Sequence, residues 1–116
     1  MHLNHMTLTL EHARCEILPS DPDGWIEVRV EGTMDQAGAR GVEGSVRFAA
    51  MDAPAGVLID CTRCAFVDSS GLRLLVESQQ MAAARSIGWR LRPSDQLRKL
   101  LMATSLDDML TEPPAA

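Results

Sequence analysis

The sequence predicts a single α/β domain, in which a mixed sheet of four to five strands is backed by three or more helices. Its 116 residues suit one domain, and strand-like runs alternate with segments of helical period. The apolar run Val57-Leu58-Ile59, between Gly56 and Asp60, is typical of a central parallel strand. The expected order of elements is β-β-α-β-α-β-α, with right-handed crossovers.

Two strands are expected before the first helix. Residues 7–10 and 25–30 alternate apolar and polar positions, as half-buried strands do. The segment between them, residues 19–24, is dense in Pro, Asp, Ser and Gly and predicts a turn. We therefore expect an N-terminal hairpin whose second strand carries Ile26, Val28 and Val30 on one face.

Three segments have helical character. After Gly32, one face is apolar, although three glycines each cost that helix up to about 1 kcal/mol, so tertiary packing must hold it. A second helix is expected from Ser69 to about Ile87, with Gly88 ending it. After a strand at residues 89–92, Ser94 should cap a third helix. The inward residues expected are Val42, Val46, Ala49 and Ala50 in the first helix, Leu72, Leu75, Val76, Ala82 and Ala83 in the second, and Leu97, Leu100 and Leu101 in the third.

Charge and composition argue against several classes of partner. The net charge is -5 and the pI is near 5.0, whereas binding to a phosphate backbone needs clustered Lys and Arg. Only 3% of residues are aromatic, which argues against a base-stacking surface. No apolar stretch approaches the roughly 20 residues of a membrane span. We expect no nucleic-acid binding, no membrane insertion and a cytoplasmic location.

The cysteines are Cys15, Cys61 and Cys64, an odd number that suits a reducing compartment. Cys61 and Cys64 have C-x-x-C spacing, but no second ligand pair follows, and the histidines all precede residue 13. Cys61 also ends a strand-like run, whereas a thioredoxin-like motif opens a helix. We therefore interpret the cysteines as small buried or half-buried side chains, and we expect no metal or cofactor.

The sharpest motif is Asp68-Ser69-Ser70-Gly71, at the start of the second helix. A Ser or Asp at this point normally caps the helix, which is worth about 1 kcal/mol. The same exposed N–H groups and the positive end of the helix dipole also suit an anion. A phosphate on Ser69 would add about -1.5 to -2 charges there. Both interpretations, a structural cap and a phosphorylated switch, fit this motif.

Four segments of the chain resemble the STAS domain family, and within it the bacterial anti-sigma factor antagonists. Residues 56–60 (GVLID) and 66–72 (FVDSSGL) look like that family's third strand and phosphorylation loop. Residues 30–35 (VEGTMD) resemble its Gly-x-x-Asp turn before the first helix, and residues 94–101 resemble its third helix. Ser105 stands where the family often has Gly. The resemblance implies a STAS-like domain over residues 1–110, followed by a frayed tail at 111–116.

The resemblance implies a specific function. Ser69 would be phosphorylated by a partner that is both an anti-sigma factor and a serine kinase, and a serine phosphatase would reverse the modification. The unphosphorylated protein would bind this partner and so release the sigma factor. Asp35, Asp68, Ser70 and Gly71 would lie on the partner-facing surface.

Two other functions need weighing. A Ser at a strand-to-helix turn also occurs in α/β-hydrolases, but Val67 replaces the first Gly of G-x-S-x-G and no late His is available for a triad. We therefore expect no enzyme activity. A STAS accessory subunit of a lipid or ion transport complex, which binds a partner without obligatory phosphorylation, stays open as an alternative.

Overall fold

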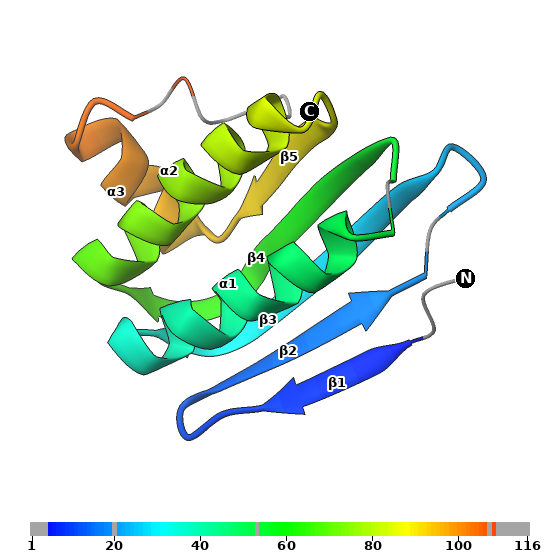
Figure 1. Ribbon diagram of the computed structural model, residues 1–116. Coiled ribbons are helices and arrows are strands. Elements are labelled where there is room, and N and C mark those ends of the chain that lie inside the picture. The colour runs from blue at the N-terminus through cyan, green and yellow to red at the C-terminus, as the bar shows by residue number, and fades with distance from the viewer. Residues whose placement is uncertain (1–4, 20, 53, 107, 109–116) are drawn as a thin grey trace.

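The computed structural model describes residues 5–19, 21–52, 54–106 and 108. The predicted α/β class is confirmed, but the chain has one strand more than expected before the first helix (Figure 1). The predicted tail at 111–116 lies outside the described residues. The elements in chain order are β1 (Met6–Thr9), β2 (Ala13–Leu18), β3 (Trp25–Met34), α1 (Gln36–Ala50), β4 (Gly56–Val67), α2 (Ser69–Ala84), β5 (Gly88–Pro93) and α3 (Asp95–Ala103).

The five strands form one mixed sheet in the order β1-β2-β3-β4-β5. The pairs β1/β2 and β2/β3 are antiparallel, whereas β3/β4 and β4/β5 are parallel. The expected direct hairpin between residues 7–10 and 25–30 is wrong, because β2 lies between them: Cys15 pairs with Leu8 on one side and with Val30 on the other. The signal for β2 was present, since Ala13, Cys15 and Ile17 alternate with exposed or half-buried neighbours.

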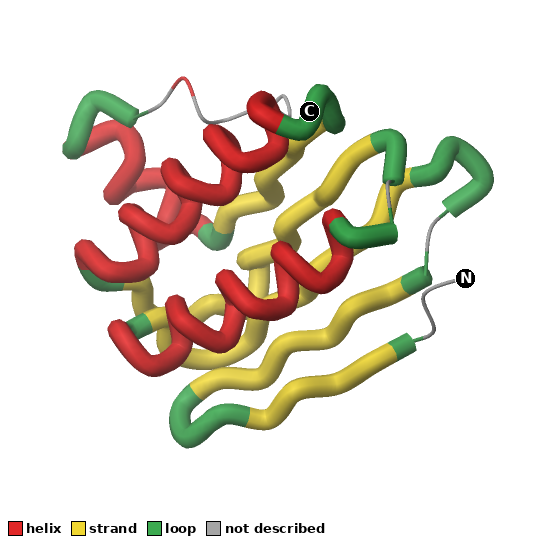
Figure 2. Tube along the Cα trace, viewed as in Figure 1, coloured by secondary structure: helices red, strands yellow, loops and turns green. Residues whose placement is uncertain are grey.

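Helices α1 and α2 lie side by side over one face of the sheet, and α3 packs against β4 and β5 (Figures 1 and 2). The expected inward face of α1 is confirmed, as is the burial of Leu97 and Leu101 in α3. The inward face of α2 is shifted from the expected one, because Ala83 is exposed and Leu72 and Val76 are only half-buried. The residues that α2 buries are Gly71, Leu74, Leu75, Ser78 and Ala82.

Strand β4 continues well beyond the expected end at Cys61. Its pairing with β3 has two irregularities, and each inserts one extra residue in β4: two steps along β3 from Arg29 match three along β4, and one step from Gly32 matches two. In a regular strand, residues three apart point to opposite faces. Because of these bulges, Cys61, Cys64 and Val67 are all buried instead.

All three cysteines are free and buried, as predicted. Burial raises the pKa of the Cys15 thiol to about 11. A hydrogen bond with the Cys64 thiol, together with burial, raises the pKa of Cys61. A neutral buried thiol is a weak nucleophile and a poor metal ligand, so these side chains act as core packing.

Two serines, rather than glycines, occupy left-handed positions just after helices. Helix α2 ends at Ala84 rather than near Ile87, and Ser86 has a φ of 58°. Ser105, after α3, has a φ of 59°, a left-handed conformation that Gly adopts more readily than Ser. At the other end of α3, Ser94 is the predicted cap, because its Oγ accepts a hydrogen bond from the Leu97 N–H at 3.1 Å.

The glycines of α1 differ in what surrounds them, and this leads to a stability prediction. A Cβ at Gly44 would meet no atom within 4 Å, so we expect Gly44→Ala to raise the free energy of unfolding by up to about 1 kcal/mol. A Cβ at Gly38 would lie 2.6 Å from the Thr33 carbonyl oxygen, so Gly38→Ala should lower the free energy of unfolding by about 1–3 kcal/mol. Chemical denaturation measures both changes, and effects of the same sign would contradict the packing of α1.

Candidate functional site

The pairing of β3 with β4 places two helix starts next to each other. Met34 and Val67 are partners in this parallel pair, and each is followed by an Asp that begins a helix. The Asp68 N–H donates to the Met34 carbonyl at 3.3 Å, which joins the two chain segments directly. The carboxyl edge of the sheet therefore brings Asp35 together with the segment that carries Asp68 and Ser69.

Asp68 is the residue that caps α2. Its Oδ1 accepts hydrogen bonds from the backbone N–H groups of Ser70 at 2.9 Å and Gly71 at 3.2 Å. Ser69 is therefore the first residue of the helix rather than its cap, and its side chain is exposed. Among the described residues, the Ser69 hydroxyl has no hydrogen-bond partner. This hydroxyl is therefore not needed to stabilise the helix.

Asp35 caps α1 in the same way that Asp68 caps α2, and its carboxylate also contacts His12. Its Oδ1 accepts from the Gly38 N–H at 2.9 Å, and its Oδ2 lies 3.3 Å from Nδ1 of His12. The bond from Gly38, aided by His12, lowers the pKa of the Asp35 carboxyl. Asp35 is thus a half-exposed carboxylate beside the start of α2, and it contributes negative charge to this end of the domain.

Gly71 has a structural task. It is buried, and a Cβ there would lie 2.7 Å from Cγ1 of Val67 and 2.9 Å from the Met34 carbonyl oxygen. A glycine is needed for the first turn of α2 to approach the ends of β3 and β4 this closely. The structure therefore places Gly71 beneath the surface, where it lets the helix start that carries Ser69 and Ser70 lie against the strand ends.

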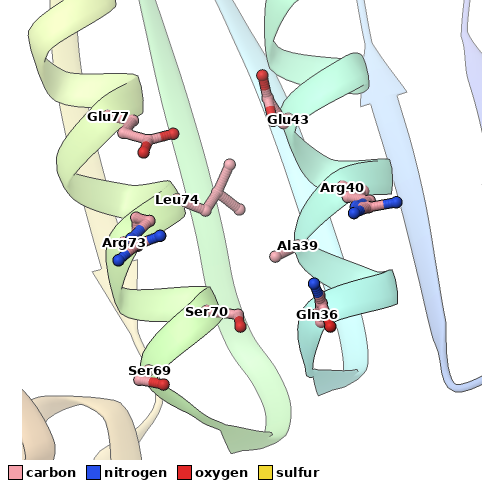
Figure 3. Close-up of a pocket in the computed structure, with 9 residues that line it drawn as sticks. All are labelled: Gln36, Ala39, Arg40, Glu43, Ser69, Ser70, Arg73, Leu74 and Glu77. Atoms are coloured by element: carbon pink, nitrogen blue, oxygen red, sulfur yellow. The ribbon is translucent and has the colours of Figure 1, made fainter.

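An open groove of about 280 Å³ separates the N-terminal halves of α1 and α2, and both serines line it (Figure 3). Arg73 lies one helical turn beyond Ser69, and Arg40 comes from α1; neither guanidinium is ion-paired within the described part of the chain. The lining is polar and open, unlike the enclosed apolar pockets that bind most small molecules. The residues of the groove are Gln36, Ala39, Arg40, Glu43, Ser69, Ser70, Arg73, Leu74 and Glu77.

One exposed apolar residue lies close to the serines in the sequence. Phe66, two residues before Asp68 in the sequence, lies near the end of β4, and its side chain is 47% exposed. Phe66, Arg40 and Arg73 are not among the site residues predicted from the sequence. The spacing of four between Ser69 and Arg73 could have indicated that they share a helix face. Nothing local in the sequence indicates that Phe66 is exposed, because this follows from the second bulge in β4.

The family model described as "Mlab, STAS domain" matches residues 20–112. The chain belongs to the STAS domain family. The resemblance inferred from residues 56–72 is thereby confirmed, and the site described above lies within the matched segment. Comparison with curated proteins gives no match.

Solved structures share the fold of this STAS domain. An anti-sigma factor antagonist from Mycobacterium paratuberculosis is similar with a TM-score of 0.73 and 23% identity, over 93% of this chain and 92% of that chain. Unphosphorylated SpoIIAA, an anti-sigma factor antagonist, has a TM-score of 0.66 and 17% identity, over 94% and 87%. The phosphorylated form of SpoIIAA, a Bacillus cell fate determinant, has a TM-score of 0.62 and 16% identity, over 94% and 90%.

Two further findings concern the described part of this STAS domain. Its His, Cys, Asp and Glu side chains form no group of three or more that could hold a metal ion. None of the helices described is both long enough and apolar enough to span a membrane.

Proposed function

We propose that this STAS domain is a phosphoswitch like the anti-sigma factor antagonists. In this proposal it binds an anti-sigma factor with serine kinase activity when Ser69 is unmodified, and it is released when Ser69 is phosphorylated. The observation that carries the proposal is the exposed, unbonded hydroxyl of Ser69 on a helix that Asp68 already caps. The SpoIIAA structures support it, since that protein with the same fold occurs in phosphorylated and unphosphorylated forms.

The local electrostatics support tolerance of a phosphate by the domain itself. The first residue of a helix lies at the positive end of its dipole, where a negative group is favourable by about 0.3–1 kcal/mol. Arg73 lies one helical turn after Ser69 and is exposed, so a cation lies on the same face of α2 as Ser69. Adding the modification therefore leaves α2 in place.

The same charge acts differently on a docking protein. The carboxylates of Asp35 and Asp68 already lie at this end of the domain, and the whole chain is acidic. A partner that covers Ser69 with an apolar or acidic surface would have to desolvate and face a dianion. A penalty of roughly 3 kcal/mol would reduce affinity more than 100-fold, which is enough for an on/off switch.

We further propose that the domain is a binding module without enzyme activity. His12 reaches this edge of the sheet, but it pairs with Asp35, and no hydrogen bond connects it to Ser69 among the described residues. The site therefore offers an acceptor hydroxyl and a docking surface without an assembled nucleophile and base. Ester hydrolysis that depends on Ser69 would contradict this part of the proposal.

Phosphate acceptance tests the site directly. The full chain is incubated with ATP and each anti-sigma kinase of the source organism, and its intact mass is measured. We expect one phosphate on the wild type, one on Ser70→Ala and none on Ser69→Ala. A phosphate retained by Ser69→Ala would show that the acceptor is another residue.

The partner recovered by the protein separates the remaining alternatives. Recovery of a histidine-kinase-like ATPase in a pull-down supports the antagonist role of Ser69, Asp35, Asp68 and Ser70. Recovery of an ABC-type ATPase or a permease, with no phosphate gained, would instead assign the domain to a transport complex as an accessory subunit.

A further inference from the structure

The two edges of the sheet differ in how they are protected against pairing with another strand. An edge strand exposes unpaired backbone N–H and C=O groups, and charged residues or Pro usually block them. β5 forms one edge and carries Arg90, Arg92 and Pro93. β1, at the other edge, has the sequence MTLT with neither charge nor Pro. β1 is therefore the edge open to a further strand.

An exposed apolar surface adjoins this unprotected edge. Met6 and Leu8 pair with the core residues Ile17 and Cys15, so they lie on the face of the sheet that α1 covers. They are nevertheless 44% and 43% exposed, and Phe48 of α1 beside them is 43% exposed. A hollow of about 190 Å³ opens here, lined by Met6, Thr7, Leu8, Ile17, Gly44, Ser45 and Phe48.

We propose that this edge pairs with a second copy of the same chain, β1 against β1 in antiparallel orientation. With Leu8 opposite Leu8 of the second copy, Met6 faces Leu10 and Thr7 faces Thr9. The same register sets His5, which bonds Glu16 of its own chain at 3.0 Å, opposite Glu11, so apolar residues meet apolar ones and polar residues meet polar ones. Directly opposed residues of these kinds contribute roughly 0.2–1 kcal/mol per pair.

Self-complementarity favours a second copy over an unrelated strand. A two-fold axis at Leu8 satisfies the open backbone groups of both copies at once and extends the two sheets into one of ten strands. It also brings the two exposed Phe48 side chains, each beside its own β1, to the same face of the joined sheet. The alternative register, centred on Thr7, would set Met6 opposite Leu8 and His5 opposite Thr9 instead of Glu11.

This dimer is independent of the proposed phosphoswitch. Ser69 begins α2, and α2 contacts β4, β5 and α1, whereas β1 lies at the opposite edge of the sheet (Figure 1). The groove between α1 and α2 would stay open in both copies. Each dimer would then present two equivalent docking surfaces, whether or not these are regulated by phosphate.

Sedimentation equilibrium of the full chain tests the association. We expect the wild type to approach twice its 12.6 kDa mass at micromolar concentrations, and Leu8→Glu to remain a monomer with an unchanged circular dichroism spectrum. Met102→Glu, at an exposed apolar residue of α3, is the matched control and should remain a dimer. A monomeric wild type, or a Leu8→Glu variant that still dimerises, would overturn the proposal.

Disulfide trapping tests the register. On mild oxidation, Leu8→Cys should form a covalent dimer, because only a residue on the two-fold axis faces its own copy. Thr7→Cys should cross-link far less, and the three native cysteines are buried and free in the wild-type control. Cross-linking of Thr7→Cys in place of Leu8→Cys would rule out the register centred on Leu8.

Discussion

Replacing Ser69 by Asp is expected to weaken binding to the anti-sigma kinase by more than about 100-fold while the domain keeps near-native thermal stability. The added carboxylate lies at the first residue of α2, where the helix dipole favours it. Asp68 continues to cap the helix through Ser70 and Gly71, so no native hydrogen bond is lost. Isothermal titration with the kinase and thermal denaturation measure the two quantities.

The matched control is Ser69→Asn, which has nearly the shape of Asp without its charge. We expect Ser69→Asn to retain most of the affinity, because the proposed switch acts through charge at the docking surface. An equal loss of affinity in both variants would mean that size alone blocks the partner. Strong destabilisation by Ser69→Asp would show that the hydroxyl has a structural role that the capping by Asp68 does not explain.

Local signals explain which parts of the fold could be predicted. Caps and strand periodicity act over a few residues, so the starts of α2 and α3 and the central run Val57-Leu58-Ile59 were predicted correctly. The bulges of β4 depend on its pairing with β3, and they replace a period of two by a spacing of three at Cys61, Cys64 and Val67. The strand predicted from the continuous apolar run therefore ended too early, near Cys61 instead of at Val67.

The same distinction, between local signals and the packing of distant segments, applies to the site. Asp35 was expected near Asp68 only through the resemblance to STAS domains, and the structure adds that each Asp follows a strand of a parallel pair and caps the next helix. The groove between α1 and α2 could not be predicted, since it depends on how the two helices pack. The glycines that weaken α1 in isolation include Gly38, which allows the helix start to lie against Thr33. The roles assigned to Ser69, Ser70, Asp35 and Asp68 in partner binding stay predictions.

The second large effect is expected at Gly32, where Gly32→Ala should lower the free energy of unfolding by about 2–5 kcal/mol. Gly32 has a φ of 95°, and a Cβ there would lie 2.4 Å from the carbonyl oxygen of His12, a backbone atom that cannot rotate away.

That contact lies beside the Thr33 N–H, which donates to the same oxygen at 2.8 Å, and His12 in turn pairs with Asp35. The substitution should therefore also disturb the start of α1, which chemical denaturation together with the chemical shift of the Gly38 amide would detect.

Gly24→Ala is the matched control: the φ of Gly24 is also positive, at 86°, but the atom nearest to an added Cβ is the Ala55 side chain at 3.2 Å. Gly24→Ala should lower the free energy of unfolding by the backbone strain alone, about 1–2 kcal/mol. Equal losses in the two variants would mean that the backbone contact with His12 contributes nothing beyond the left-handed conformation.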